Sequence, residues 1–316
     1  METIAVRALA DPAVLLEGFS RDCHLRGMTA ESTRRYLSSL KIFVDFLEKR
    51  GLSLGGVDAF VLRDFLQLLV ERGVKRKTVE NYFSALSAFF DFLVFEGYVG
   101  SNVVLPFRRR YLRRYKCDGG GCAVRRLLSV EEMSRLVNSI LDPRDRAIAV
   151  LLAKTGIRRG ELLRLDVEDI NWVDGSITLK PTPKRSNRVV FFDDECAVAL
   201  RRWLRVRSSL NPPSDALFVS YQSLGRLDRN GLYTAIVKYA RRLGFHKSDS
   251  PRLEDHFGPH CFRHWFTTWL IRNGMSREYV KELRGDKRRE AIDIYHHIDR
   301  QELRKAYLAC IPKLGA

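Results

Sequence analysis

The sequence has no segment that would carry the chain into or across a membrane. Its longest apolar runs, such as Ile148–Ala153, are far too short to span a bilayer. It contains no basic stretch followed by an apolar one that would indicate a signal peptide, and no lipidation signal at either end. We therefore expect a cytoplasmic protein with no membrane partner.

The sequence also has no disulfide framework and no evident metal site. Its six cysteines are scattered, and only Cys117 and Cys122 lie close together. A zinc site would need two further ligands nearby, and no histidine lies in that segment. There is no glycine-rich phosphate loop and no evident carboxylate cluster for a metal. We expect reduced thiols, no metal and no other cofactor.

Acidic residues are too few to balance the basic ones. The chain has 55 Lys and Arg against 38 Asp and Glu, which gives a net charge of +17 and a pI of about 9.9. A field of that sign attracts polyanions, of which nucleic acid is the commonest in a cell. A hydrophobic content of 45% indicates a folded chain, and 316 residues suit two domains better than one.

Residues 1–105 are predicted to form a helical N-terminal domain. Three helices are indicated by polar residues at their starts and glycines behind their ends: Thr29 or Ser32 to Gly51, Asp58 to Arg72, and Lys77–Thr78 to Gly97. The aromatic residues at helical spacing in these segments are assigned to the core.

Residues 106–126 differ from the rest in composition and are predicted to be a flexible, basic linker. They contain eight basic side chains against the single acid Asp118, and a triple glycine, Gly119–Gly121. Two tyrosines, Tyr111 and Tyr115, are interleaved with the arginines. A basic run is usually only a solvated surface, but this one joins two domains, so we expect it to contact a nucleic-acid backbone.

Residues 127–316 are predicted to form a second domain that is mostly helical with a small β element. Its expected elements are a capping-box helix from Ser129, helices at Pro143–Lys154 and Arg159–Arg164, strands at Ser176–Leu179 and Arg188–Phe192, and further helices from Asp194 onward.

Two segments of this domain place cations where a phosphate could bind. Gly156 ends one helix and puts Arg158 at the start of the next, where free N–H groups favour an anion and the planar guanidinium can bond two oxygens. The alternative is a surface arginine paired with Glu161. Lys184 lies in the turn between the two strands and could donate a proton to a departing oxygen, although such a lysine is usually only solvated.

The segment His260-Cys-Phe-Arg263-His264 lies in an apolar helix that continues through Trp265 and Phe266. His260 and Arg263 are three residues apart and share a face. A helix packed around Trp and Phe seldom tolerates an unpaired arginine, so Arg263 should meet an anion, either a carboxylate or a substrate phosphate. His264 is expected to be structural.

Tyr295 lies in the segment Ala-Ile-Asp-Ile-Tyr-His-His near the C-terminus. Taken alone, this tyrosine would be interpreted as a half-buried packing residue. In the order Arg158, Lys184, His260-x-x-Arg263, Tyr295, these residues resemble the catalytic set of the tyrosine recombinase or phage-type integrase family, of the XerC/XerD-like kind. The segments Thr-Gly-Ile-Arg-x-x-Glu-Leu and His-x-x-Arg-His are similar to that family's best-known boxes, and the resemblance covers nearly the whole chain.

The resemblance implies a helical core-binding (SAM-like) domain followed by a mixed α/β domain that breaks and rejoins DNA. Tyr295 would attack a phosphodiester and form a 3′-phosphotyrosine, Arg158 and Arg263 would hold the phosphate oxygens, His260 would assist, and Lys184 would protonate the departing oxygen. Neither ATP nor a metal is implied.

The chain departs from the family pattern at Asp286, where a histidine or tryptophan is common. Its carboxylate would repel a phosphate if it pointed inward while ionised, or it could hold Arg158, Arg263 or Tyr295 in place. The role could also pass to Lys287. Lys180 is the alternative to Lys184, because hairpin loops vary in length.

The expected partner is double-stranded DNA, bound by a tetramer on two sites, with a free monomer or dimer. The expected backbone contacts are Arg34, Lys77, Arg109, Arg113 and Arg185, and the candidate contacts between subunits are Leu303, Tyr307 and Leu308. The segment around Tyr295 favours an archaeal origin and a nucleoid-associated enzyme of a mobile element or chromosome. The alternatives are a type IB topoisomerase and a DNA-binding protein that has lost catalysis.

Overall fold

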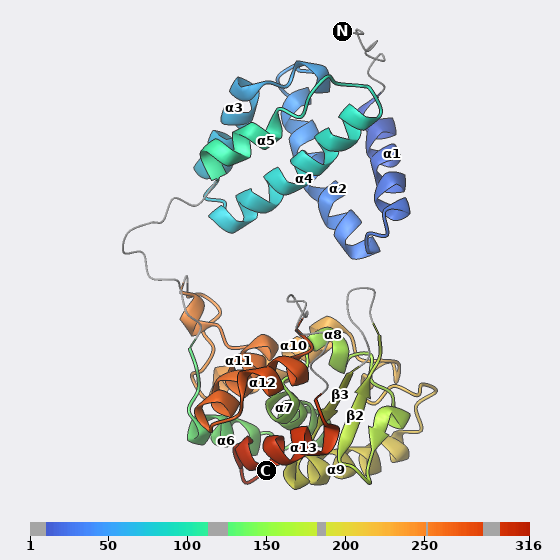
Figure 1. Cartoon of the computed structure of the whole chain (residues 1–316), viewed down its shortest axis with the longest axis vertical. Helices are drawn as coiled ribbons and strands as arrows, with labels where there is room; N and C mark the ends of the chain where they lie inside the picture. Colours follow the sequence, from blue (N-terminus) through green and yellow to red (C-terminus); the bar gives the residue numbers. More distant parts are fainter. Residues whose placement is uncertain (1–10, 113–125, 182–187, 251, 287–297) are drawn as a thin grey trace. The chain divides into compact units, whose positions relative to one another are not determined.

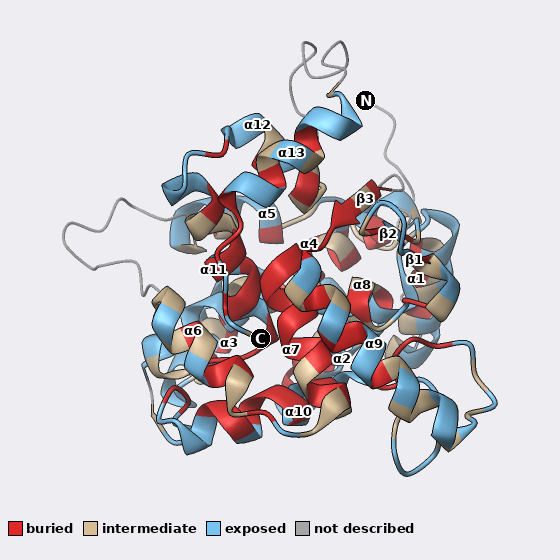
Figure 2. Cartoon of the chain, turned by 90° about the horizontal axis from the view of Figure 1, so that it is seen from below, coloured by how far each residue is buried: buried red, intermediate tan, exposed pale blue. Residues whose placement is uncertain are grey.

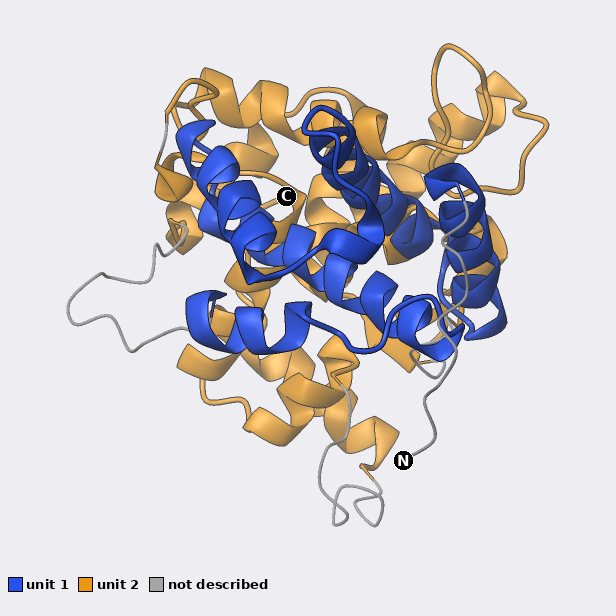
Figure 3. Cartoon of the chain, turned by 90° about the horizontal axis from the view of Figure 1, so that it is seen from above, with its two compact units in different colours: residues 1–120 blue, residues 121–316 orange. Residues whose placement is uncertain are grey.

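The computed structural model describes residues 11–112, 126–181, 188–250, 252–286 and 298–316. The chain divides into two compact units, residues 1–120 and 121–316 (Figure 1; Figure 3). The prediction of a mostly helical chain with a small sheet in its second half is confirmed. In these described ranges, no helix is both long and apolar enough to cross a membrane.

The first unit is a bundle of helices whose starts are fixed by capping side chains. Its elements are α1 (Pro12–Leu25), α2 (Ala30–Glu48), η1 (Leu54–Gly56), α3 (Ala59–Glu71), α4 (Arg76–Phe95), α5 (Val104–Phe107) and the π-helical turn η2 (Arg108–Leu112). Thr29 caps α2 and Asp58 caps α3, as predicted. Helix α1 was not among the predicted helices, although Asp11 caps it and Pro12 occupies its first turn.

Aromatic side chains form much of the core of this unit. Phe43 and Phe65 meet edge to face, with ring centroids 4.9 Å apart. Phe83 and Phe107 stack at 5.2 Å, and both are buried. Burying one such side chain contributes about 1.5–3 kcal/mol. The helices at 104–112 therefore belong to the first unit, and the described part of the expected linker begins as folded structure.

The second unit surrounds the buried helix α7 (Figure 2). Its helices are α6 (Val130–Asn138), α7 (Pro143–Thr155), α8 (Arg159–Leu162), η3 (Val167–Asp169), α9 (Asp194–Leu210), α10 (Arg229–Arg242), η4 (Leu253–Asp255), α11 (Pro259–Arg272), α12 (Arg277–Arg284) and α13 (Arg300–Cys310). The apolar run Ile148–Ala153 lies in α7 and is wholly buried, because α9 and α11 pack against this helix. The predicted capping box at Ser129 starts α6.

The sheet is antiparallel, in the order β1-β2-β3. Its strands are β1 (Ile170–Asn171), β2 (Ser176–Leu179) and β3 (Arg188–Phe191). The two longer strands lie where the sequence predicted them, with Ser176 paired to Phe191. The third strand, β1, was not predicted, because it is too short for an alternating pattern to show.

Gly156 ends α7 in the left-handed conformation, with φ +58°. A Cβ added at this position would lie 2.3 Å from the ring of Phe266 on α11. Glycine thus allows both the turn and the close approach of α11 to α7. Arg158 follows two residues later, as the N-cap residue of α8.

The last residues fold back onto the second unit. Leu303 and Tyr307 are buried, and the Tyr307 hydroxyl donates to the Lys154 carbonyl at 2.9 Å. Glu195 accepts from the backbone N–H groups of Leu314 and Gly315. Leu303 and Tyr307 were expected to contact a neighbouring subunit, but here both pack within their own chain.

Candidate active site

Arg158 is positioned by the short helix that it begins. Its backbone N–H donates to the Glu161 carboxylate at 2.7 Å, and its guanidinium contacts the same carboxylate at 3.2 Å. The ion pair between Arg158 and Glu161, which the sequence offered as the alternative to phosphate binding, therefore exists. The guanidinium also donates to the Arg284 carbonyl at 2.9 Å and lies 3.4 Å from Oδ1 of Asp286. Arg158 thus combines the local ion pair with contacts from the distant end of α12.

Arg263 lies deeper, on α11, with 5% of its side chain exposed. It donates to the carbonyls of Gly156 and Arg284, at 2.8 Å each, and lies 3.3 Å from Oδ1 of Asp286. Burial, helped by the positive charge of Arg284, lowers the pKa of Arg263 to about 10. The guanidinium therefore stays charged at neutral pH, and the prediction that Arg263 meets an anion is consistent with its contact to Asp286.

Arg158 and Arg263 converge on the same two acceptors at the end of α12. These acceptors are the Arg284 carbonyl and the carboxylate of Asp286, which lie on either side of Gly285. Gly285 has a φ of +59°, and a Cβ there would lie 2.5 Å from Arg188. The glycine therefore lets the chain turn tightly enough to present both acceptors. Asp286 contacts both arginines, which agrees with the interpretation that it holds Arg158 and Arg263 in place.

Glu161 and Arg188 complete this cluster, and Arg188 was not among the predicted site residues. Two nitrogens of Arg188 donate to the two Glu161 oxygens at 2.8 Å each, and its Nε donates to the Leu283 carbonyl. The cluster contains four guanidinium groups, those of Arg158, Arg188, Arg263 and Arg284. Only two carboxylates, Glu161 and Asp286, oppose them among the described residues. Two positive charges remain for an anion.

His260 and His264 lie on the exposed side of α11. Their rings meet edge to face, with centroids 4.9 Å apart, and both side chains are exposed. His260 and Arg263 therefore lie three residues apart on one helix, but His260 is exposed and Arg263 is buried. His264, expected to be structural, is a direct neighbour of His260 at the surface.

Lys180 lies at the end of β2 and is held by acidic side chains. It forms an ion pair with Asp166 and lies 3.8 Å from Asp169. The hydrogen bond to Asp166 raises the pKa of Lys180. A lysine held in this way keeps its proton more firmly, which disfavours it as a proton donor. Lys184, Arg185, Arg113 and Tyr295 lie outside the described residues, as do Lys287, Cys117 and Cys122.

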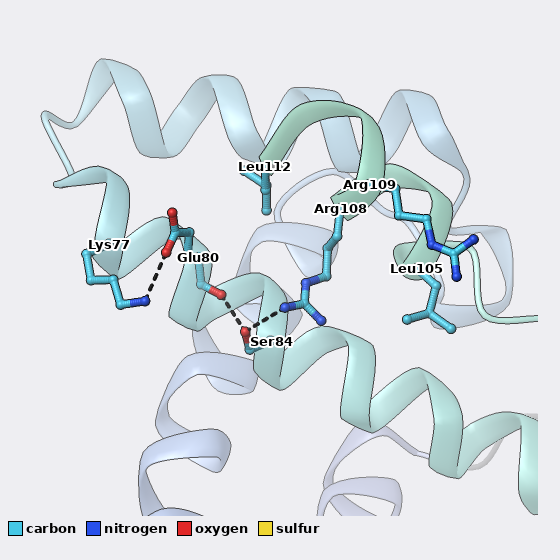
Figure 4. A pocket seen from close by; sticks show the side chains of 7 residues that line it. All are labelled: Lys77, Glu80, Ser84, Leu105, Arg108, Arg109 and Leu112. Carbon is cyan, nitrogen blue, oxygen red and sulfur yellow. Dashed lines mark hydrogen bonds and ion pairs between the residues drawn. The ribbon is translucent and has the colours of Figure 1, made fainter. Parts of the chain in front are cut away.

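In the first unit, two of the expected DNA contacts line one groove (Figure 4). Lys77 and Arg109 border a groove of about 800 Å³, together with Glu80, Ser84, Leu105, Arg108 and Leu112. Arg34 is exposed on α2 and is not among the residues that line it. This groove is a concave, largely cationic surface built from α4, α5 and η2.

Comparison with known proteins places both units in one family. Residues 126–302 match the model of the Phage integrase family, and residues 16–97 match the Phage integrase N-terminal SAM-like domain. The chain is 32% identical over 292 residues to tyrosine recombinase XerC of Oceanobacillus iheyensis, which covers 89% of this chain and 90% of that protein. It is 30% identical to the XerC of Haemophilus ducreyi, over 81% of this chain and 80% of that one.

Solved structures show the same fold at lower identity. The XerH site-specific recombinase, bound to its difH substrate, matches with a TM-score of 0.65 at 22% identity, over 94% of this chain and 84% of that one. A lambda integrase dimer bound to a core site matches with a TM-score of 0.65 at 17% identity, over 91% and 98%. In both structures the protein is bound to DNA, and this chain shares the fold of both proteins.

Proposed function

This chain belongs to the phage integrase family, and on that premise we propose how its residues cut and rejoin DNA. It is a site-specific tyrosine recombinase. The observation that supports the residue assignment is the convergence of Arg158 and Arg263 on one carbonyl and one carboxylate. Two guanidinium groups held this way, in a cluster with two excess positive charges, suit the non-bridging oxygens of a phosphodiester.

The reaction is a phosphoryl transfer in which a protein oxygen replaces a DNA oxygen. The phenol oxygen of Tyr295 attacks the phosphorus, and the bond from phosphorus to the 5′-oxygen breaks. His260 takes up the phenol proton or binds the phosphate, and Lys184 gives a proton to the departing 5′-oxygen. The product is a 3′-phosphotyrosine and a free 5′-hydroxyl. Attack by a 5′-hydroxyl reverses these steps and rejoins the strand.

Asp286 is proposed to position the two arginines rather than to react. Its carboxylate lies 3.4 Å from Arg158 and 3.3 Å from Arg263, at a position that an oxygen of the phosphate could also take. An acidic stand-in keeps the guanidinium planes oriented, at the cost of some competition with the phosphate. The phosphate then binds to a site that needs little rearrangement.

The proposed partner is duplex DNA, contacted through its backbone by Arg34, Lys77, Arg109, Arg113 and Arg185. Each phosphate contact should add about 0.9 to the log–log dependence of affinity on salt. We propose a monomer or dimer in the free state and a tetramer on two DNA sites, located on the nucleoid in the cytoplasm. An archaeal origin stays a prediction.

A nicked suicide DNA tests the proposal, because loss of the cut fragment traps the covalent intermediate. The wild-type chain should give a protease-sensitive protein–DNA adduct, and Tyr295→Phe should give none. DNA binding by the wild type without any adduct would contradict the proposed chemistry and support a DNA-binding protein. An adduct that persists in Tyr295→Phe would contradict the choice of nucleophile. Strand exchange between two cognate sites separates recombination from simple relaxation of supercoils.

A further inference from the structure

The groove of the first unit has two walls of different origin (Figure 4). One wall is a single face of α4, because Lys77, Glu80 and Ser84 follow the i, i+3, i+7 spacing. The other wall comes from α5 and η2 and carries Leu105, Arg108, Arg109 and Leu112. The groove therefore combines cations, one carboxylate, a hydroxyl and apolar carbon.

Arg108 is the oriented cation of this groove. It is half-buried, and its Nη2 donates to Oγ of Ser84 at 3.0 Å. The Ser84 hydroxyl in turn donates to the Glu80 carbonyl at 2.7 Å, so its oxygen is fixed as an acceptor for Arg108. No carboxylate in the described ranges forms an ion pair with Arg108. Its other N–H donors are therefore not committed to a described acid.

Arg109 differs from its neighbour in this respect. It is exposed, and Figure 4 shows its side chain directed away from the Ser84 hydroxyl that holds Arg108. An exposed arginine of this kind suits a phosphate as a charged contact. Two adjacent arginines thus provide one oriented fork and one exposed charge.

The chemistry of the groove fits the edge of a base pair better than a phosphate. Glu80 is paired with Lys77 at 3.0 Å and lies 3.9 Å from Arg76, so this carboxylate takes up part of the positive charge that would otherwise attract a phosphate into the groove. A base pair instead presents donors, acceptors and, at thymine, a methyl group in the major groove. The arginine fork matches O6 and N7 of guanine, and Leu105, which is 40% exposed, offers carbon to a thymine methyl.

We propose that this groove reads a base edge of the target DNA, with Arg108 as a specificity-determining residue for guanine. Arg109 contacts the backbone beside it. This inference rests on the proposed function, because it assumes that duplex DNA is the partner of the first unit. It assigns the groove to recognition of sequence rather than to general attraction of DNA.

The test is selection of bound duplexes from a random DNA pool by the full-length chain and its variants. Arg108→Lys keeps the positive charge but removes the fork, so it should lose the preference for guanine at one position of the selected motif. Affinity for the wild-type motif should fall by about tenfold to a hundredfold, while the salt dependence stays unchanged. Arg109→Ala is the matched control. It should keep the motif, weaken binding to all sequences, and lower the salt slope by about 0.9.

A second variant separates orientation from folding. Ser84→Ala retains Arg108 but removes the hydroxyl that holds it, and should weaken the same guanine preference by a smaller factor. Thermal unfolding of each variant, unchanged from wild type, confirms that the unit is folded. A motif that is the same in Arg108→Lys and in wild type overturns the inference and leaves the proposed function intact. A wild-type chain that binds no duplex DNA overturns both.

Discussion

Two clusters of charged residues meet the same end of α7 and differ in how completely the protein neutralises them. Lys154, on the last turn of α7, has a fully buried side chain that contacts Asp193 at 2.7 Å, Glu195, and the carbonyl of Pro312 at 2.7 Å. The cluster of Arg158 and Arg263 begins four residues further on and is partly open, with 27% of the Arg158 side chain exposed. One cluster is closed and the other is accessible.

The difference lies in the balance of charge. In the closed cluster two carboxylates oppose Lys154 and Lys313, so the described side chains neutralise one another. In the open cluster four guanidinium groups face two carboxylates. Buried charges that are matched hold the C-terminal segment in place, whereas charges left in excess at a partly exposed position are available to a ligand. The same kinds of side chain therefore serve stability in one place and binding in the other.

The largest effect should come from breaking the closed cluster. Lys154→Met leaves Asp193 and Glu195 without their buried cation, and we expect a loss of about 3–5 kcal/mol in the free energy of unfolding. Urea unfolding of the full chain measures it. Lys313→Met is the control, because the Lys313 side chain is 64% exposed and 3.4 Å from the same Asp193. Equal losses of unfolding free energy in the two variants would show that the burial of Lys154 does not make it more important for stability than the exposed Lys313.

Breaking the open cluster should change the rate of cleavage and leave stability nearly unchanged. Arg158→Ala removes a donor that is proposed to hold the scissile phosphate, and adduct formation on the nicked substrate should slow by about 100- to 1,000-fold. The neighbouring Arg159 is exposed, and Arg159→Ala should cleave at close to the wild-type rate. A comparable loss in both variants would argue against a specific role for Arg158.

Removing a negative charge from the open cluster should change DNA affinity and cleavage rate in opposite directions. Asp286→Asn removes the negative charge that is proposed to compete with phosphate, so DNA should bind more tightly. The two arginines lose a charged acceptor, and cleavage should slow by about tenfold. Binding and single-turnover cleavage, measured together, test this split. Glu278→Gln, an exposed change on α12, the helix that precedes Asp286, should alter neither quantity. Weaker binding by Asp286→Asn would contradict the proposed competition.

The smallest effect is a dependence of stability on pH in the closed cluster. Burial raises the pKa of Glu195, but hydrogen bonds from Lys154, Leu314 and Gly315 outweigh it, and the net pKa is lowered. A lowered folded-state pKa stabilises the chain at neutral pH, and this stabilisation is lost as the pH falls through that pKa. Unfolding midpoints of wild type and Glu195→Gln should therefore differ at pH 7 and approach each other in acid. A constant difference would contradict this assignment.

Local signals in the sequence predicted much of the fold. Thr29, Asp58 and Ser129 each cap a helix by a bond to a residue two or three positions away, so the sequence contains the whole interaction. The strand Ser176–Leu179 was predicted at its observed bounds. Residues 106–112 were assigned to the linker by their charge, yet Phe107 anchors them in the first core. The basic composition of this segment favoured a linker, although it contains the core residue Phe107.

Contacts between distant segments could not be predicted in the same way. Arg188 and Glu161 are 27 positions apart, and Lys154 and Pro312 are 158 apart. No spacing rule links such residues, because the fold alone brings them together. The order of Arg158, Arg263 and Asp286 along the chain was informative only through the resemblance to a family. The acceptor that Arg158 and Arg263 share, the Arg284 carbonyl, belongs to the backbone and cannot be recognised from residue type.

Gly156 limits how this enzyme can be altered by random mutagenesis. A methyl group at that position would collide with Phe266 and displace α11, the helix that carries Arg263, from the turn that carries Arg158. Every substitution there changes the spacing between the two guanidinium groups, even though the residue itself has no side chain to react. Libraries that aim to retarget the enzyme should therefore leave this codon fixed and vary the groove of the first unit.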